Sequence, residues 1–272
     1  MPRSAPHGNR PAAGRVDKRP QAVTLAGGTP NAKDIRMSNR TLAILVLVAA
    51  LAFAASPLIF PGFAGYDPDR FPIPQQDPPV QPAGWAFSIW GVIYLWLIAG
   101  AGFGLWRRAE DEEWRLMRTA LLASLTIGFF WLPVAQRLPG LATLMILAML
   151  VTAVTAMIWA GRRDRWLEGR PVALYAGWLT AASGASAGIW LGGHGWLSAQ
   201  AAAIVCLIAV GLLALGVQAL RPREWAYPAA VIWALAGVVA ANWGAGNWPV
   251  IAIAVLAAAL LALRAVTGSR TS

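Results

Sequence analysis

Cysteine, histidine and lysine are almost absent from this chain of 272 residues. The single cysteine, Cys206, excludes an intramolecular disulfide and a cysteine-based metal site. The two histidines, His7 and His194, cannot supply the pair of axial ligands that some haems need inside a membrane. The two lysines, Lys18 and Lys33, both precede the first apolar run, so no lysine is available there for a Schiff base.

Charged residues are also scarce, at 12% of the chain, whereas 58% of its residues are hydrophobic. A typical soluble domain has about 25% charged residues. Six long windows contain no Asp, Glu, Lys or Arg: 41–66, 78–106, 119–136, 138–161, 171–220 and 225–263. Proton relays and coupled transporters usually need a charge inside the membrane, and hydrolysis needs an acid or a base. We therefore expect neither a proton pump nor an enzyme.

The charge-free windows predict helices that span a membrane, since each span needs about 20 apolar residues. The fifth window is divided by the glycine cluster at 192–195, and the sixth by the polar, glycine-containing run 242–247. The predicted helices cover residues 41–60, 84–106, 119–136, 141–160, 172–191, 198–219, 227–242 and 248–264. The fold class is thus an all-α, polytopic membrane helix bundle with about eight transmembrane helices.

The net charge of +10 follows the predicted topology. If both termini are cytoplasmic, the cytoplasmic segments hold every basic residue except Arg70 and Arg137. This distribution obeys the positive-inside rule and favours the bacterial inner membrane. Because the basic residues form short clusters between apolar runs and no single basic face, we expect no nucleic acid partner.

The two ends of the chain are predicted to lie outside the bundle. Residues 1–40 are basic and rich in Pro, Gly and Ala, as in a disordered cytoplasmic tail, and 265–272 form a second tail. Met37 is an alternative start. A signal peptide is a competing interpretation, because the apolar run 41–51 is followed by an A-x-A pattern at 52–54, and cleavage would leave seven helices. A retained helix is favoured, since the apolar stretch continues through 57–60.

Tryptophan is abundant, with 15 copies against 8 phenylalanines and 4 tyrosines. Ten of them lie near predicted helix ends, where an interfacial belt explains them. The other five are predicted to lie deeper, where a buried indole N–H needs a partner. These are Trp90, Trp96, Trp131, Trp178 and Trp233.

Aromatic residues recur at helical spacing in the second and fifth predicted helices. Phe87, Trp90 and Tyr94 share one face of the second helix, and Trp85 faces elsewhere. On the fifth helix, Tyr175, Trp178, Ala182 and Ser186 share one face of that helix. There an aromatic end gives way to small residues, which leave room for a ligand or for close packing of another helix.

The run from Pro82 to Tyr94 resembles the second-helix signature of the tryptophan-rich sensory protein/translocator protein family (TspO/MBR). The run 171–182 is similar to that family's fifth-helix pattern, and Trp131 stands where the family has another tryptophan-bearing helix. The resemblance covers 41–192 as a five-helix bundle. The spacing of Trp85 and Trp90, a serine at 186 where the family has asparagine, and a three-helix extension at 193–264 indicate a longer, divergent member.

The resemblance implies an aromatic pocket under the loop 61–83, with a porphyrin or haem-like molecule as ligand and no covalent cofactor. The expected ligand-binding residues are Trp85, Phe87, Trp90, Tyr94, Trp131, Tyr175, Trp178 and Ser186, with no catalytic or metal-binding residue. Expected partners are a hydrophobic small molecule, the lipid bilayer and, as an open option, a second copy of the chain. A sensor or binding protein with a regulatory or transport role is the first functional hypothesis. A small-molecule exporter of the drug/metabolite type and a structural accessory subunit are the alternatives.

Overall fold

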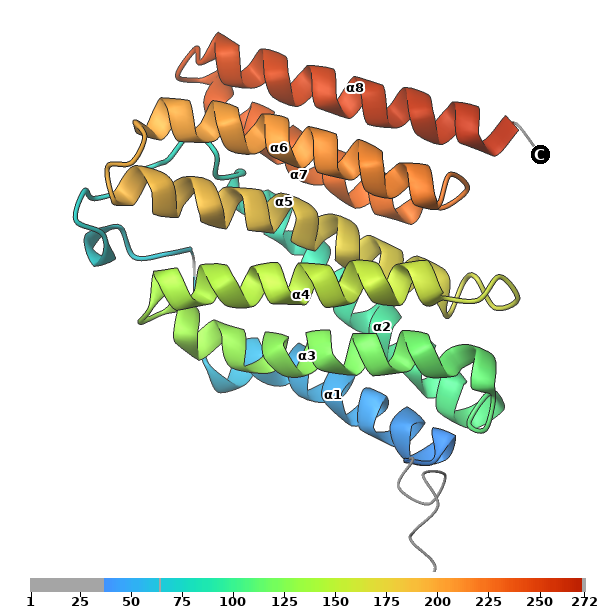
Figure 1. The fold of residues 1–272 in the computed structure, drawn as a ribbon. Helices are drawn as coiled ribbons and strands as arrows, with labels where there is room; N and C mark the ends of the chain where they lie inside the picture. Colours follow the sequence, from blue (N-terminus) through green and yellow to red (C-terminus); the bar gives the residue numbers. More distant parts are fainter. Residues whose placement is uncertain (1–36, 64, 271–272) are drawn as a thin grey trace, which may run out of the picture. The chain divides into compact units, whose positions relative to one another are not determined.

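The computed structural model describes residues 37–63 and 65–270, except for the side chains of residues 269 and 270. Within these ranges the chain forms eight α-helices and no strand, which confirms the predicted all-α membrane bundle (Figure 1). The helices are α1 (Asn39–Ile59), α2 (Ile89–Arg107), α3 (Arg115–Ala135), α4 (Pro139–Trp159), α5 (Gly169–Gly193), α6 (Ala199–Leu220), α7 (Ala226–Trp243) and α8 (Trp248–Arg270). Three short 3-10 helices lie in the connections: η1 (Pro68–Arg70), η2 (Gly84–Ser88) and η3 (Glu112–Trp114).

The two predicted breaks in the long apolar windows are confirmed. After α5 the chain turns at Gly195, and after α7 it turns at Gly246; their φ angles are 71° and 63°. A side chain with a Cβ rarely adopts this left-handed conformation, so glycine at these two positions permits the tight reversal between neighbouring helices.

The outer helix boundaries differ from the prediction by a few residues. The first helix begins at Asn39 because the hydroxyl of Ser38 accepts the backbone N–H of Thr41 at 3.1 Å and caps it. The last helix is predicted to end at Arg264 but continues to Arg270. An arginine at a membrane surface can extend its guanidinium group into water, so it does not end a helix. The predicted tail 1–40 therefore overlaps the start of α1, and the predicted tail 265–272 overlaps the end of α8. Residues 1–36 lie outside the described residues.

Seven helices, α1 to α4 and α6 to α8, are long and apolar enough to cross a membrane. The 25 residues of α5 include many small and hydroxyl-bearing side chains, and most of them are buried. This helix packs against α2, α4, α6 and α7. Because protein surrounds α5 on most sides, small residues that allow close helix approach replace the large apolar residues that face lipid elsewhere.

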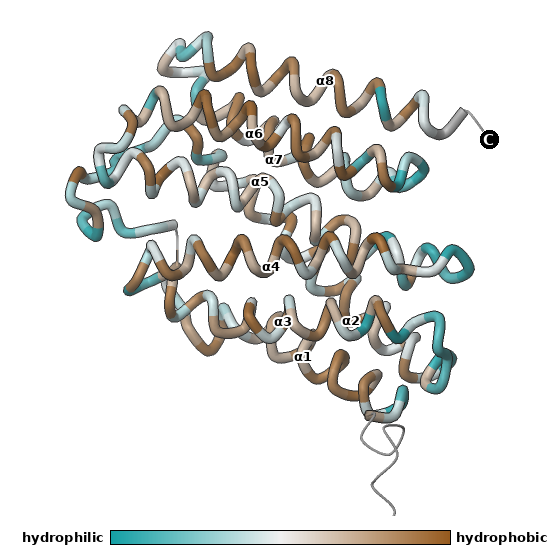
Figure 2. Tube along the Cα trace, viewed as in Figure 1, coloured by the Kyte–Doolittle hydropathy of each residue, from teal (hydrophilic) through white to brown (hydrophobic). Residues whose placement is uncertain are grey.

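The helices lie roughly alongside one another, in the order α1, α3, α4, α5, α6 with α7, and α8, with α2 behind (Figure 1). Hydrophobic residues colour the helices along their length, and hydrophilic residues gather in the connections at both ends (Figure 2). A helix of 20 residues is about 30 Å long, which matches the hydrocarbon core of a bilayer.

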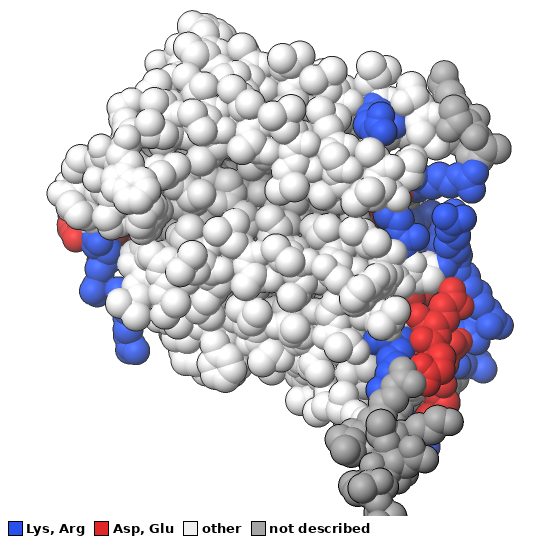
Figure 3. Space-filling view, in the orientation of Figure 1, with Lys and Arg blue, Asp and Glu red and all other residues white. Residues whose placement is uncertain are grey.

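The charged side chains gather at one end of this bundle, as Figure 3 shows. We call this the basic end; it holds the start of α1, the connections α2–α3, α4–α5 and α6–α7, and the last turns of α8. At the opposite end the basic residues among the described ones are Arg70 and Arg137. This separation is the one that the positive-inside rule requires of a membrane protein.

Candidate functional site

Aromatic residues from η2, α2 and α5 meet in the middle of the bundle. The rings of Trp90 and Tyr94 stack, with centroids 5.2 Å apart. Trp178 meets Phe87 and Trp90 edge to face, at 5.7 and 5.9 Å. The face that the sequence predicted for Phe87, Trp90 and Tyr94 therefore points toward the aromatic part of α5, and Phe53 of α1 packs against Tyr94 at 5.2 Å.

These rings line the first chamber of a cavity, which has a volume of about 570 Å³. Its walls come from α1 to α5 and from both ends of the connection between α1 and η2. Among the lining residues are Phe53, Phe63, Gln81, Phe87, Trp90, Tyr94, Gly128, Trp131, Met149, Trp178 and Ala182. The wall has no Asp, Glu, His, Lys or Arg side chain, and the volume is in the usual range for a small-molecule site.

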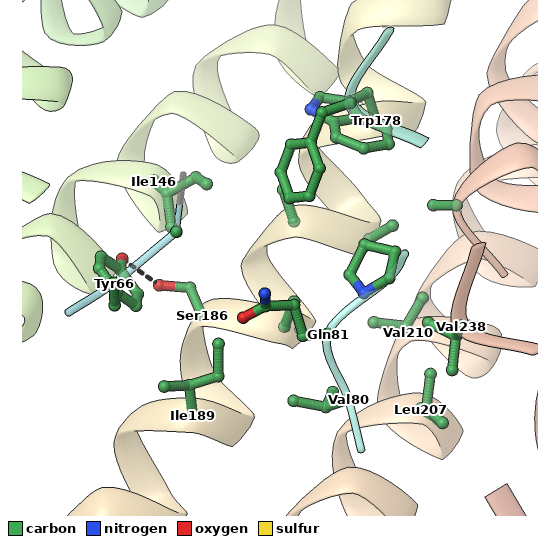
Figure 4. A pocket seen from close by; sticks show the side chains of 18 of the residues that line it. Tyr66, Val80, Gln81, Ile146, Trp178, Ser186, Ile189, Leu207, Val210 and Val238 are labelled. Atoms are coloured by element: carbon green, nitrogen blue, oxygen red, sulfur yellow. Dashed lines mark hydrogen bonds between the residues drawn. The ribbon is translucent and has the colours of Figure 1, made fainter. Parts of the chain in front are cut away.

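A second, smaller chamber of about 80 Å³ adjoins the first. The two chambers share Phe87, Trp131, Trp178 and Ala182 in their walls. The second chamber extends between α5, α6 and α7, where its lining is aliphatic: Leu207, Val210, Ala234, Leu235 and Val238. Figure 4 shows the Gln81 side chain between Ser186 on one side and Val210 and Val238 on the other.

The connection between α1 and η2 covers the cavity and is attached to the bundle at several points. The hydroxyl groups of Tyr66 and Ser186 are 2.6 Å apart (Figure 4), and the hydroxyl group of Thr143 is 2.9 Å from that of Ser186. Near its end, the amide of Asn242 donates to the carbonyl of Pro79 at 2.8 Å. The loop expected to act as a lid therefore lies over the cavity and is held by side chains of α4, α5 and α7.

The indole N–H of Trp178 is the one buried tryptophan donor in the cavity wall that has no partner among the described residues. Three of the other deep tryptophans donate to backbone carbonyls: Trp96 to Trp166, Trp131 to Ala142 and Trp233 to Ala86, at 2.8 to 2.9 Å. Trp178 is 1% exposed, and its Nε1 makes no hydrogen bond within the described residues. A buried donor without a partner is costly, so an acceptor brought within its reach would stabilise the protein.

A family comparison agrees with this architecture. Residues 73–267 match the family model described as TSPO-like protein. The chain belongs to the TSPO-like family. No curated protein and no solved structure matches it.

The family match covers a different part of this TSPO-like protein from the resemblance recognised in the sequence. It begins in the connection that follows α1 and ends inside α8, so it includes the three helices beyond residue 193. The resemblance covered 41–192. The division into a five-helix bundle and a three-helix extension stays a prediction, while membership of a divergent branch of the family is supported.

Two of the expected site residues of the TSPO-like protein lie outside the cavity wall. Trp85 is 48% exposed and packs edge to face on Trp233 of α7, with ring centroids 5.0 Å apart. It precedes α2 in the 3-10 turn η2, whose tighter winding directs it away from Trp90. Tyr175 lies behind the wall: it is fully buried, and its hydroxyl is 3.0 Å from that of Ser124.

The other six expected residues line the cavity, and the structure adds several that the sequence did not indicate. Ser186 lines the second chamber, and Trp131 and Trp178 line both. The additional residues are Phe53, Phe63, Tyr66, Gln81 and the aliphatic residues of α6 and α7. Of these additional residues, only Tyr66 could have been noticed in the sequence, because tyrosine is rare there, with four copies. The aliphatic residues resemble every other lipid-facing or core residue.

Most acidic and basic side chains among the described residues of the TSPO-like protein lie at the basic end, and none lines the aromatic cavity. Arg108 and Asp164 form an ion pair of 2.8 Å, and this bond lowers the pKa of the Asp164 carboxyl. Glu168, just before α5, is buried, and its Oε1 accepts the backbone N–H of Gly161 at 2.7 Å. Burial, together with the negative charges of Glu113 and Asp164, raises the pKa of Glu168 to about 7.

We expect the stability of the protein to fall as the pH rises from about 5 to about 8. The unfolded chain loses the Glu168 proton near pH 4.3, whereas the folded chain keeps it up to about pH 7, so folding is favoured at the acidic side of this window. Glu168→Gln should flatten the pH dependence of the melting temperature in detergent, by about a few degrees. The exposed Glu110→Gln is the matched control; an equal slope in all three proteins would contradict the assignment.

Proposed function

We propose that this TSPO-like protein is a membrane sensor or binding protein for a flat, hydrophobic ligand of the porphyrin or tetrapyrrole type, with a regulatory or transport role. The observation that carries the proposal is the first chamber: an aromatic cavity, covered by a loop, without a charged side chain in its wall. Aromatic rings bind the face of a flat molecule through dispersion and edge-to-face contacts. Family membership supports the same ligand class.

We propose binding, and not catalysis, as the activity of this cavity. General acid–base chemistry needs an ionisable side chain within hydrogen-bond reach of the substrate. The acidic and basic side chains described above lie at the two ends of the bundle, and none lines either chamber. We also propose that both termini are cytoplasmic and that the protein resides in a bacterial inner membrane, on the distribution of its basic residues.

A titration of purified protein with protoporphyrin IX, followed by quenching of tryptophan fluorescence, tests the proposal. Trp178→Phe should weaken binding about tenfold, since it removes the indole with its unpaired N–H and leaves a smaller aromatic surface against the ligand. The empty protein should tolerate the change, because that N–H has no partner to lose. Trp90→Phe and Tyr94→Phe should weaken binding as well. Trp85→Phe, which is outside the cavity, should bind like the wild type.

Because the cavity wall carries no charge, the same titration with an uncharged porphyrin gives a second test. The dimethyl ester of protoporphyrin is neutral, so it should bind at least as tightly as the diacid. Quenching that is equal in the cavity variants and in Trp85→Phe would overturn the proposal. An increase in dye accumulation after gene deletion, without specific porphyrin binding, would instead favour the exporter hypothesis.

A further inference from the structure

A second cavity, of about 320 Å³, opens at the basic end between the connections α4–α5 and α6–α7 and the end of α8. It is separate from the aromatic cavity and shares none of its lining residues. Four arginines line it, together with a single carboxylate: Arg162, Arg165, Arg221, Arg223 and Glu224. The wall therefore carries an excess of positive charge, with the Glu224 carboxylate as its one negative group.

One of the four arginines is part of the fold. Arg221 donates from Nε and Nη2 to the carbonyl of Met157, at 3.1 and 2.8 Å, and from Nη2 to that of Ala160, so it caps the end of α4. Burial lowers the pKa of Arg221, the nearby carboxylates of Glu224 and Glu168 raise it, and the positive charges of Arg162 and Arg165 lower it. Four positive charges thus lie close together with Glu224 as the one carboxylate that lines the cavity, and an added anion would reduce their repulsion.

The other three arginines of the cavity have no such structural role. Within the described residues, the guanidinium groups of Arg162, Arg165 and Arg223 make no hydrogen bond and no ion pair with the chain. Glu224 lies just before α7, where its Oε1 accepts the N–H of Ala226 at 3.3 Å, and its carboxylate also attracts Arg165, Arg170 and Arg221. Three guanidinium groups with free donors around one cavity match the chemistry of a phosphate, which arginine binds with two donors at once.

The cavity lies where a lipid headgroup would be. Exposed Trp166 and Trp225, typical of a membrane interface, pack together beside it with ring centroids 6.2 Å apart. The guanidinium of Arg170 lies over both rings, at 3.8 and 5.5 Å, and its Nη1 is buried without a partner. The cavity wall also includes Leu220, which is 62% exposed and continues into the lipid-facing side of α6.

We propose that this cavity binds the phosphate of an anionic phospholipid, whose acyl chains lie along the apolar surface of α6 and α8. Basic pockets between membrane helices on the cytoplasmic side are suited to such headgroups. The aromatic and apolar rim favours a lipid over a soluble phosphate compound, since a soluble anion gains nothing from exposed Trp166, Trp225 and Leu220. The proposal is independent of the ligand in the aromatic cavity.

Native mass spectrometry of the delipidated protein in detergent, titrated with phosphatidylglycerol, tests this site. The wild type should bind phosphatidylglycerol at least about tenfold more tightly than phosphatidylcholine, because both carry the phosphate but the arginines repel the choline cation of the second. The double variant Arg162→Gln/Arg165→Gln should lose this preference. The matched control is Arg107→Gln/Arg163→Gln, which removes the same charge from the same end but from residues that do not line the cavity.

Three results would overturn the proposal. They are an equal loss of the preference in both double variants, an unchanged preference in Arg162→Gln/Arg165→Gln, and binding of soluble glycerol phosphate as tightly as of the lipid. Melting temperatures measured in lipid-free detergent identify a folding defect. They should be equal in the two double variants, since the replaced guanidinium groups of Arg162 and Arg165 bond to no described residue.

Discussion

Ala182→Phe is expected to weaken porphyrin binding by about 10- to 100-fold without unfolding the protein. Ala182 lies in the walls of both chambers, at the place where they adjoin. A phenyl ring there occupies space that the ligand needs, and removing or displacing it costs about 1–3 kcal/mol, as overpacking does elsewhere. The empty protein has room for the ring, so its melting temperature should change little.

The matched control for this variant is Ala209→Phe, which adds the same ring to an exposed position of α6. Fluorescence titration with protoporphyrin IX measures the affinity of both variants, and the melting temperature in detergent checks their folding. Wild-type affinity in a folded Ala182→Phe protein would show that the ligand does not enter the cavity.

Gly177→Ala is expected to destabilise the protein by about 1–3 kcal/mol, the range found when a packed core receives an extra methyl group. A Cβ at Gly177 of α5 would overlap the backbone carbonyl oxygen of Tyr227 in α7 and lie 3.0 Å from the Cβ of Ala230. The two helices would have to separate. Their separation would also strain the bond between the hydroxyl groups of Thr180 and Tyr227, which are 3.0 Å apart.

Gly216→Ala makes the same replacement inside α6, where a Cβ meets no atom within 4 Å. Alanine favours a helix over glycine by about 1 kcal/mol, so this variant should be as stable as the wild type or more stable. Thermal unfolding in detergent, followed by tryptophan fluorescence, compares the two. Equal melting temperatures of Gly177→Ala and Gly216→Ala would mean that α5 and α7 are not packed as closely as the structure has them.

The position of α5 shows where reasoning from the sequence stopped. The sequence predicts a helix at 172–191, and α5 is there, but nothing in its apolar pattern indicated that it lies at the centre of the bundle. In a membrane the lipid-facing and the core-facing sides of a helix are both apolar, so periodicity does not tell which side is buried. The small residues on α5 were compatible with a ligand cavity or with close packing. The structure has both, because Ala182 lines the cavity while Gly177 approaches Tyr227.

The tryptophans show the same limit. The position of a tryptophan within a predicted helix indicates its depth in the membrane, and on that basis the sequence predicts five deep tryptophans. Which indole N–H finds an acceptor depends on a carbonyl from another helix, as with Trp233 and Ala86, 147 positions apart in the chain. No local pattern reports such a pair, so only the structure could single out Trp178.

The sequence by itself determined the class of protein, the number of helices, the turns between them and the end of the bundle at which positive charge gathers. Hydropathy, charge and glycine content act locally along the chain, so they can be interpreted without knowledge of the packing. The tertiary structure decided which helix is central, that the cavity has a second chamber toward α6 and α7, and that two connections bring four arginines to one cavity. These features arise from contacts between distant segments, whose partners are chosen by shape and hydrogen bonding across the whole bundle.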